Sequence, residues 1–304
     1  MPDNKRTAFF PVDFATWGYL IILSLIIIIF RRNQADWRWY ILFDFLVFLL
    51  IFLIVKFFED KPKTWSAFFR HWYPVFLFTI LYEQTRYLIH LIFNHWFDPW
   101  INSVEFKLFG TCPTIWFQKI ASVPLNEYMM FSYFFYYFIM PILGAFLYFT
   151  GKVKEFDKMV FAAAIAFYIS YLGFIFMPVQ GPRYQLADFY YLKLAGIIFA
   201  PLAQFVVKVG GLHGGCMPSS HVAVALVVLI YCIKYQKKLA WFLGPLIISL
   251  FVATIYGRFH YFSDVVVGLF IGFLSYLFCE RIYRKKSVNL SVGTHMGPDR
   301  PVIP

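Results

Sequence analysis

The sequence predicts an all-α protein, a polytopic transmembrane helical bundle of about seven or eight spans with a six-helix core. Three observations support this fold class, and the first two come from the composition. Of the 304 residues, 61% are hydrophobic and 14% are charged, whereas a soluble domain carries about 25% charged residues. The third observation is a series of long apolar runs that are separated by short polar or basic connections.

Eight apolar runs are long enough to cross about 30 Å of hydrocarbon as helices. The first run is short and the last three lie close together, so seven and eight spans both fit the sequence. The runs cover residues 14–30, 39–57, 72–93, 128–150, 159–178, 218–234, 239–256 and 262–280.

No soluble domain fits between these runs. Residues 1–71 are predicted to form N-terminal transmembrane helices with an anchoring or accessory role, and residues 72–286 to form the main membrane domain. Residues 287–304 hold three Pro and two Gly with little apolar periodicity, which predicts a mobile C-terminal tail.

Basic residues are distributed unevenly between the two faces. With eight spans both termini lie on one face, and most of the 27 Lys and Arg residues fall there. The positive-inside rule therefore predicts cytoplasmic termini for this multi-pass protein, although Arg31, Arg32 and Arg38 fall on the opposite face. The net charge of +11 indicates membrane orientation and not nucleic-acid binding, because no basic stripe lies on a soluble domain.

Long connections lie on the face opposite the termini. Residues 94–127, 179–217 and 257–261 all open on that side. Within them, residues 98–118 and 194–211 mix apolar and polar side chains and are predicted to form interfacial or re-entrant elements. They either guide a lipid toward a site or cover the helix ends.

The four cysteines have no spacing typical of metal ligands. Cys232 and Cys279 fall within apolar runs and are predicted to be inert. Cys112 and Cys216 fall in loops on the same face, where a disulfide between them is one option if that face is oxidising.

Pro218-Ser219-Ser220-His221 lies where the sixth run begins. Proline is well suited to a first helical turn, so Ser219 and Ser220 would lie where free N–H groups favour an anion. His221 in the same turn would be close to a bound phosphate and able to transfer protons near neutral pH. The alternative is a capped helix start with an interfacial histidine.

His260 and Asp264 are four residues apart at the start of the eighth run. On a helix they share one face, so the carboxylate can orient the ring and leave its other nitrogen free as a nucleophile. Arg258 would add a planar donor for phosphate oxygens. A purely structural His–Asp hydrogen bond is the other interpretation.

Arg183 follows a rigid Gly-Pro turn at the same face, where it would bind phosphate or reach toward lipid headgroups. One carboxylate among two arginines and two histidines suits a dianionic phosphate and argues against a divalent-metal site. Glu83, Arg86 and His90 share one face of the third run. A Glu83–Arg86 pair that locks helix packing and a supporting contact with substrate are both consistent with that placement.

The ordered blocks Gly181–Tyr184, Cys216–Val222 and Arg258–Asp264 resemble the type 2 phosphatidic acid phosphatase superfamily, and more narrowly its branch near inositol phosphorylceramide synthase. The resemblance covers residues 128–280. It extends less specifically to Tyr82–Gln118. It implies a helical bundle with a membrane-facing pocket, no metal and no other cofactor, and a lipid phosphate as substrate.

The resemblance also implies roles for individual residues. His260 would be the nucleophile that forms a phosphohistidine, Asp264 would orient it, and His221 would protonate the leaving alcohol. Three residues would hold the phosphate oxygens, namely Arg183, Ser219 and Ser220.

Two positions depart from the family pattern. Phe176 stands where the broad family has a lysine, and Thr254 stands where the third block has an arginine. Arg258, four residues from the second position, is a candidate substitute. Loss of two cations is expected to weaken phosphate binding or to change the acceptor.

These residues favour a membrane enzyme, a metal-independent lipid phosphatase in which water resolves the phosphohistidine. A lipid phosphotransferase, with a lipid hydroxyl as acceptor, would use the same residues up to the covalent intermediate. A non-enzymatic transporter or lipid-binding protein is the third option, although no internal repeat typical of transporters is found.

Overall fold

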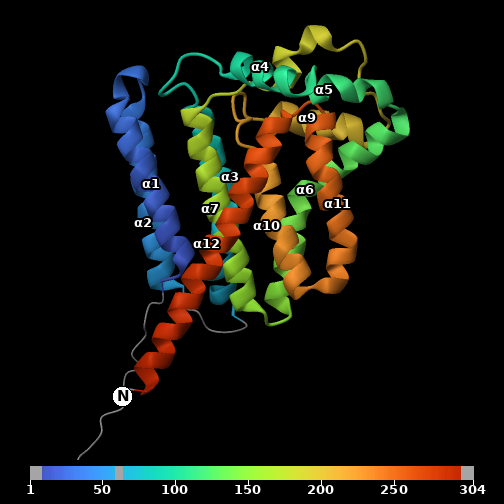
Figure 1. Cartoon of the computed structure of the whole chain (residues 1–304). Helices are drawn as coiled ribbons and strands as arrows, with labels where there is room; N and C mark the ends of the chain where they lie inside the picture. Colours follow the sequence, from blue (N-terminus) through green and yellow to red (C-terminus); the bar gives the residue numbers. More distant parts are fainter. Residues whose placement is uncertain (1–8, 59–63, 296–304) are drawn as a thin grey trace, which may run out of the picture.

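The computed structural model describes residues 9–58 and 64–295, with side chains described as far as Lys285. Within these residues it contains helices and their connections but no β-strand. This confirms the predicted all-α class. Long helices run side by side through the molecule, and shorter helices lie across one end of the bundle (Figure 1).

Six helices of the described part are long and apolar enough to cross a membrane. α3 (Trp65–Arg86) and α10 (Ser220–Tyr235) run beside them; α10 is apolar but only 16 residues long. The polytopic helical bundle is therefore confirmed. The six helices are α1 (Pro11–Ile29), α2 (Trp37–Phe57), α6 (Val123–Phe149), α7 (Val153–Phe176), α11 (Lys237–Tyr256) and the segment Phe262–Lys285 of α12 (Phe262–His295).

Several helix boundaries differ from the sequence-based expectation, among them the start of α3 and the end of α12. α3 begins at Trp65 and not near residue 72, because the Thr64 hydroxyl accepts a hydrogen bond from Ala67 N at 3.1 Å and caps the helix. α12 continues to His295, into the segment predicted to be a mobile tail. Residues 296–304 of that segment lie outside the described residues.

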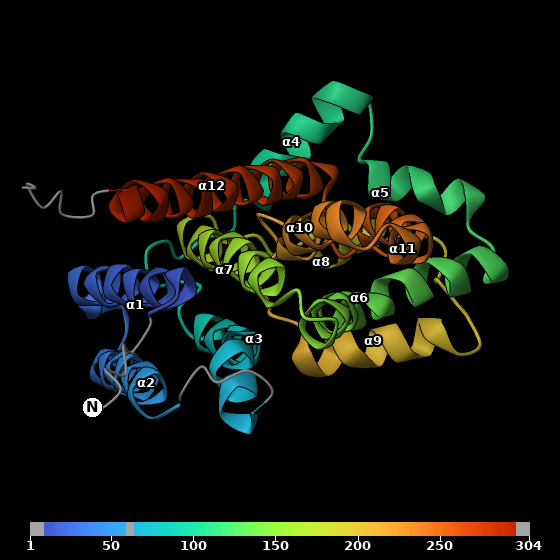
Figure 2. The ribbon, with the colours of Figure 1, turned by 90° about the horizontal axis from the view of Figure 1, so that it is seen from below.

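Short helices gather at the end of the bundle where α11 ends and α12 begins (Figure 1). The two segments predicted to be interfacial, 98–118 and 194–211, fold there into short helices. α9 lies alongside α6 when the molecule is viewed along the bundle (Figure 2). The short elements are α4 (Asp98–Phe109), α5 (Pro113–Trp116), α8 (Pro182–Gln185), α9 (Phe199–Gly210) and the 3-10 helices Arg31–Asn33, Phe117–Ile120 and Ala187–Phe189.

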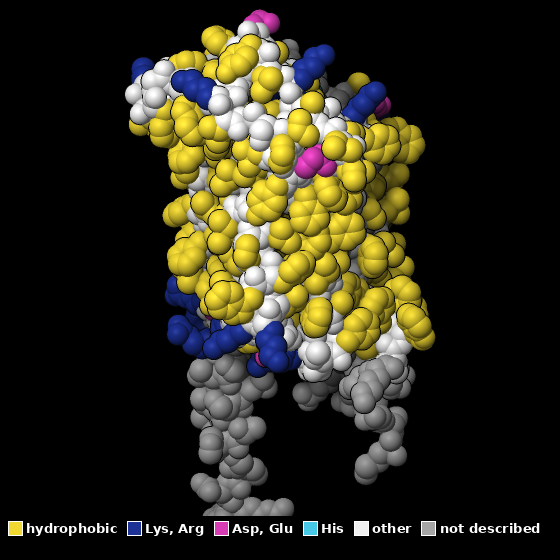
Figure 3. Space-filling model, turned by 90° about the vertical axis from the view of Figure 1, so that its right-hand side faces the viewer, with side chains coloured by type: hydrophobic (Ala, Val, Ile, Leu, Met, Phe, Trp, Pro, Cys, Tyr) yellow, Lys and Arg dark blue, Asp and Glu magenta, His cyan; other side chains and the backbone are white. Residues whose placement is uncertain are grey.

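The outer surface matches a lipid environment. Figure 3 shows a broad band of hydrophobic side chains across one face of the bundle, with Lys and Arg gathered at the end away from α4 and α5 and a few more at the opposite end. Large hydrophobic side chains such as Trp241, Phe270 and Ile248 are well exposed along the helices. Exposed apolar area on this scale is typical of a surface covered by lipid.

A buried ion pair fixes the N-terminal helix to the rest of the bundle. Arg70 of α3 donates to Asp13 of α1 at 2.5 Å, and Tyr73 donates a further hydrogen bond to the same carboxylate. Both charged side chains are buried. Because a buried charge is stabilised only by such partners, α1 is tied firmly to α3.

Two glycines allow α12 to approach α10 closely. A Cβ on Gly268 would lie 2.6 Å from the Ser219 carbonyl oxygen, and one on Gly272 would lie 2.3 Å from that of Ala223. Small residues four apart are typical of tightly packed membrane helices. This packing holds the N-terminal ends of α10 and α12 together, and both ends carry candidate site residues.

The Gly272→Val variant is expected to lose about 1–3 kcal/mol of unfolding free energy, because the added atoms collide with backbone and not with a movable side chain. Thermal unfolding of the detergent-purified protein measures the loss. Gly18→Val in α1 is the matched control, since no atom lies within 4 Å of its added Cβ. Equal unfolding temperatures for the two variants would show that the α10–α12 contact is not tight.

Candidate active site

The two histidines predicted from separate blocks meet at one end of the bundle. His221 lies in the first turn of α10, and His260 lies in the turn between α11 and α12. Their ring centroids are 5.6 Å apart. Ser219 N also donates to the Asp264 carbonyl oxygen at 3.1 Å, which fixes the two helix starts to each other.

The start of α10 differs slightly from expectation. Ser219 is the N-cap and accepts from Val222 N at 3.4 Å, so Pro218 precedes the cap and does not occupy the first turn. Ser220 is the first helical residue. Both serines are buried beside His221, and the Ser219 hydroxyl is already engaged as a cap.

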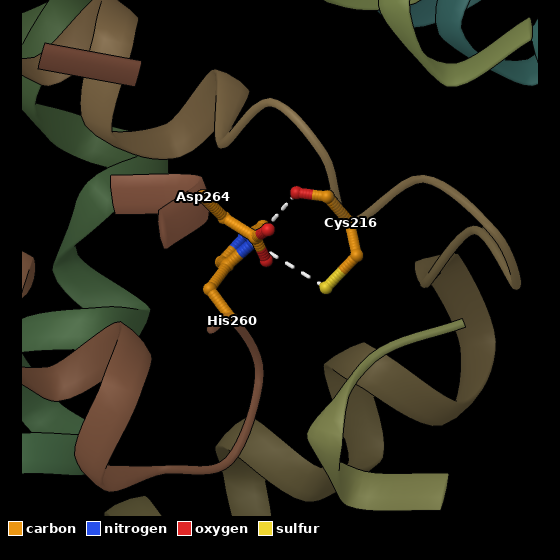
Figure 4. A group of neighbouring side chains, drawn as sticks. All are labelled: Cys216, His260 and Asp264. Atoms are coloured by element: carbon orange, nitrogen blue, oxygen red, sulfur yellow. Dashed lines mark hydrogen bonds and ion pairs between the residues drawn. The ribbon is translucent and has the colours of Figure 1, made fainter. Parts of the chain in front are cut away.

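His260 is held by two acceptors at the same ring nitrogen (Figure 4). Nδ1 lies 2.9 Å from the Cys216 carbonyl oxygen and 3.3 Å from Asp264 Oδ2, although α12 begins only at Phe262. A carbonyl oxygen can only accept, so we assign the ring proton to Nδ1. The lone pair of the neutral ring is then on Nε2.

Burial keeps this ring neutral. His260 is only 4% exposed, and its burial lowers the pKa of the imidazole to about 4, against the smaller raising effect of the Cys216 carbonyl. At neutral pH the uncharged form prevails. The site therefore presents an unprotonated Nε2, which is the form that a nucleophile requires.

His221 is surrounded by aromatic side chains. Its ring stacks on Tyr133 at 5.4 Å between centroids and lies 4.4 Å from the ring of Tyr136. Nε2 lies 3.5 Å from the Tyr133 hydroxyl, whereas the buried Nδ1 has no hydrogen-bond partner among the described residues. Since buried polar atoms are normally satisfied, Nδ1 is free to bond an atom of a bound substrate.

A cavity of about 390 Å³ opens beside the histidines and is lined by three basic side chains, Arg183, Lys193 and Arg258. Arg258 donates to the Leu192 carbonyl oxygen at 2.6 Å and lies 3.9 Å from the ring centroid of Tyr190. Its backbone φ is +64°, an uncommon conformation for a residue with a side chain and one that recurs at functional sites.

Phe259 lies between Arg183 and the aromatic side chains around His221. The Phe259 ring stacks on the Tyr133 ring at 4.1 Å between centroids, and the Arg183 guanidinium carbon lies 5.3 Å from the Phe259 ring centroid. Among the described residues that line the cavity, Phe259 is present but neither histidine is. Two stacked rings, those of Phe259 and Tyr133, therefore lie between the Arg183 guanidinium and the His221 ring.

Comparison with known proteins identifies the family. The model for the PAP2 superfamily matches residues 99–278, which is more than half of the chain and includes all three sequence blocks. The chain belongs to the PAP2 superfamily. No curated protein and no solved structure matches it.

The two positions at which this PAP2 superfamily protein departs from the family pattern have different surroundings. Phe176 is exposed at the end of α7. Thr254 is buried, and its carbonyl oxygen accepts from the backbone N–H groups of Phe259 and His260 at 3.0 Å each. Thr254 therefore shapes the His260 turn, and Arg258 lies on the cavity wall beside Arg183.

Two buried carboxylates on α4 brace the site and were not recognised in the sequence. Asp98 accepts from the N–H groups of Gln180 and Gly181 at 2.8 Å each and from the Tyr261 hydroxyl at 3.1 Å. Glu105 accepts from Ser263 N and Oγ at 2.8 and 2.9 Å. α4 thus connects the turn before Arg183 to the turn that carries His260.

The Asp98→Asn variant is expected to lose roughly tenfold to a hundredfold in activity, because the amide replaces one acceptor with a donor that faces a backbone N–H. Hydrogen bonds to a charged group contribute about 1.5–3 kcal/mol each. Turnover of a lipid phosphate measures the loss. Asp188→Asn, an exposed aspartate at the same end, is the control, and an equal effect of both changes would contradict the bracing role.

Glu127 was also missed, and it positions α9. Its carboxylate accepts from the backbone N–H groups that precede and begin this helix, at 2.7–3.2 Å. A carboxylate at a helix N-terminus is favoured by the free N–H groups and the helix dipole. The contact holds α9 against α6 beside the cavity; the donors are Ile197, Ile198, Phe199 and Ala200.

The polar residues of the third span contact one another and nearby backbone groups. Arg86 donates to Glu83 at 2.9 Å and to the Gly211 carbonyl oxygen at 3.1 Å. His90 is exposed, and its Nδ1 lies 2.9 Å from the Phe93 carbonyl oxygen. These contacts favour the interpretation that Glu83 and Arg86 fix helix packing, since they fasten the end of α9 to α3.

The disulfide that the loop positions allowed is not formed. Cys112 and Cys216 are both free and buried. Cys112 Sγ lies 3.6 Å from Asn102 Oδ1, whereas Cys216 Sγ donates to the Phe259 carbonyl oxygen at 2.9 Å. Cys216 therefore belongs to the His260 turn.

Proposed function

We propose that the protein is a membrane lipid phosphatase that acts through a phosphohistidine on His260 without a metal cofactor. PAP2 superfamily membership supports a phosphatase or phosphotransferase type of function toward lipid phosphates. The observation that carries the finer proposal is the carbonyl oxygen that faces Nδ1 of His260 and favours a proton on that nitrogen. This Nδ1 is bonded to the Cys216 carbonyl oxygen at 2.9 Å, which leaves Nε2 as the attacking atom.

In the first step Nε2 of His260 attacks phosphorus, and the bond between phosphorus and the lipid oxygen breaks. The ring becomes positively charged as the P–N bond forms. Asp264 Oδ2, 3.3 Å from Nδ1, stabilises that charge. His221 takes up a proton as the negatively charged phosphate binds beside it, because that charge favours the imidazolium, and then transfers this proton to the leaving lipid oxygen.

In the second step water attacks the phosphohistidine, and the P–N bond breaks. His221, now neutral, accepts a proton from this water and returns to its starting state. Arg183 is well placed to hold phosphate oxygens, because it lines the cavity and has no ion pair with the described residues. Arg258 adds a second cation on the same wall, and the buried Ser219 and Ser220 lie at the N-terminus of α10.

A lipid phosphotransferase is the second candidate, and enclosure of the histidines favours it. His260 is 4% exposed, and Tyr133, Tyr136 and Phe259 surround the approach to His221. A site that excludes water protects a reactive intermediate until a lipid hydroxyl arrives. An acceptor of the kind used by inositol phosphorylceramide synthase would fit this scheme.

The phosphatase and the phosphotransferase are distinguished by phosphate release. Detergent-purified protein in EDTA is assayed with a panel of lipid phosphates. Release that continues under chelation supports hydrolysis without a metal cofactor. Transfer to a labelled lipid alcohol without phosphate release supports the phosphotransferase. Neither product from any donor would favour a non-enzymatic protein and would contradict both.

The acid limb of the pH profile is expected to have its midpoint well below 6.5. His260 has a pKa of about 4, so the folded protein retains the neutral nucleophile as the pH falls through 6.5 and loses it only near 4. The pH dependence of kcat/KM measures this limb. Substrates with different phosphate pKa values separate substrate ionisation from the enzyme, and a substrate-independent limb at 6.5 would contradict a neutral, buried nucleophile.

We also place the termini in the cytoplasm and the active site on the opposite face. Basic side chains gather at the end of the bundle away from α4 and α5 (Figure 3), as the positive-inside rule requires for a cytoplasmic end. A reporter that is active only in the cytoplasm, fused after residue 304, tests this. Activity of a reporter placed in the 187–193 connection instead would reverse the assignment.

A further inference from the structure

Two potential metal ligands, Cys216 and Asp264, lie close to the Nδ1 side of the His260 ring (Figure 4). The proposed attack on phosphorus uses the other ring nitrogen, Nε2. Cys216, His260 and Asp264 each offer one ligand atom within 4.8 Å of the others. All three side chains are buried. Phosphoryl transfer uses Nε2 of His260, so the cluster around Nδ1 is a separate feature.

Two of the three distances between these ligand atoms match those around a tetrahedral ion, and the third is within 4.8 Å. Cys216 Sγ lies 3.5 Å from His260 Nδ1, and Nδ1 lies 3.3 Å from Asp264 Oδ2. Zinc bonds of about 2.0–2.3 Å to sulfur, nitrogen and oxygen place tetrahedral ligand atoms roughly 3.2–3.6 Å apart. A thiolate, an imidazole and a carboxylate form a ligand set that zinc accepts.

One oxygen of the cluster lacks a partner. Asp264 is fully buried, and its Oδ1 forms no hydrogen bond with the described residues. His260 is the only basic side chain within ion-pair distance of this carboxylate in the described part of the chain. An unpartnered carboxylate oxygen is unusual in a protein interior and is available to a cation.

We propose that Cys216, His260 and Asp264 form an inhibitory binding site for a thiophilic divalent cation such as Zn²⁺. The site itself is independent of the proposed function, whereas its inhibitory effect rests on it. Binding converts the Cys216 thiol to a metal-bound thiolate and releases one proton to solvent. The Nδ1 proton of His260 moves to Nε2 as Nδ1 becomes a ligand.

This change of tautomer removes the nucleophile. With a proton on Nε2 and the metal on Nδ1, the ring has no lone pair to attack phosphorus. No electron transfer is involved, and removal of the ion restores the original tautomer. Zinc is therefore expected to inhibit reversibly, and EDTA to maintain or restore activity.

Binding is tested first with Co²⁺, which replaces zinc at such sites and shows thiolate charge-transfer absorption when a cysteine coordinates it. Detergent-purified protein without substrate is titrated and the absorption recorded. We expect one ion per chain and a thiolate band. The Cys216→Ser variant should lose the band and bind at least about tenfold more weakly, since one of three protein ligands is removed.

Cys112→Ser is the matched control, because Cys112 is also a buried, free cysteine at the same end but lies outside the cluster. It should keep the band. The elution volume and helical content of both variants establish that they are folded. Absence of the band in the unmodified protein, or its survival in Cys216→Ser, would overturn the site.

Inhibition is tested by zinc titration of phosphate release or lipid transfer, each variant compared with its own untreated activity. Cys216→Ser should require at least about tenfold more zinc than the unmodified protein and Cys112→Ser. If zinc acts only by binding the substrate, the unmodified protein, Cys216→Ser and Cys112→Ser will be inhibited at the same zinc concentration. That result would overturn the inhibitory role of the site. If no activity is found in any preparation, the proposed enzymatic function fails, and cobalt binding alone decides whether the site exists.

Discussion

The His260→Ala variant is expected to lose at least about a thousandfold in turnover of any lipid phosphate. Removal of a nucleophile abolishes the covalent route, and the residual rate comes from substrate binding alone. The packing change is small in comparison, because the His260 backbone N–H keeps its bond to the Thr254 carbonyl oxygen at 3.0 Å. Initial rates on the best substrate of the panel measure the effect.

An exposed histidine at the same end of the molecule provides the control. His95→Ala should retain activity, since its aromatic contacts within the described residues are with Phe93 and Phe97 alone. Elution volume and unfolding temperature show whether His260→Ala is folded. A folded His260→Ala protein within tenfold of the unmodified rate would exclude His260 as the nucleophile.

The His221→Asn variant is expected to lose about a hundredfold to ten-thousandfold with ordinary lipid phosphates, the range typical of a missing general acid. Asparagine preserves polarity and much of the contact with Tyr133 and Tyr136. The loss should depend on the leaving group. An alkoxide needs a proton from His221, whereas an acidic phenol departs without one.

The diagnostic measurement compares a lipid phosphate with an aryl phosphate for both proteins. His221→Asn should approach the unmodified rate of phosphoenzyme formation with the aryl substrate, and His260→Ala should be inactive with both. An equal loss of His221→Asn on the two substrates would indicate that His221 positions the phosphate and does not protonate the leaving oxygen.

The sequence predicted the helices well because their signal is local. The long apolar runs involve only residues that are neighbours in the chain. The same is true of the Pro-Ser-Ser-His and His-x-x-x-Asp motifs. The structure brings His221 and His260 to within 5.6 Å between ring centroids, at the end of the bundle where both blocks were expected. Gly268 and Gly272, which let these helix starts approach closely, form a small-residue pair four positions apart in the sequence.

The residues that brace the site were not predicted, because their contacts join distant parts of the chain. Asp98 bonds the backbone of Gln180 and the Tyr261 hydroxyl, and Glu127 bonds the N–H groups at the start of α9. In the sequence, an aspartate in an amphipathic segment cannot be distinguished from an acidic residue on the surface. Only the fold shows that Asp98 is buried with three donors around it.

Cys216 illustrates the same limit. Its sequence neighbours suggested a loop cysteine with a disulfide as one option, and no metal-ligand spacing was found. The fold places its carbonyl oxygen on Nδ1 of His260 and its thiol 3.5 Å from that nitrogen. Both contacts depend on a turn 44 residues further along the chain, which no local pattern encodes.

The measurement that tests the central claim most directly is capture of the covalent intermediate. Protein is mixed with a labelled lipid phosphate, quenched in denaturing alkali within one turnover, digested and mapped by mass spectrometry. Phosphate on His260 that forms and decays at the rate of turnover is the predicted result. Turnover without phosphate on His260, or with phosphate on another residue, would contradict the proposed mechanism.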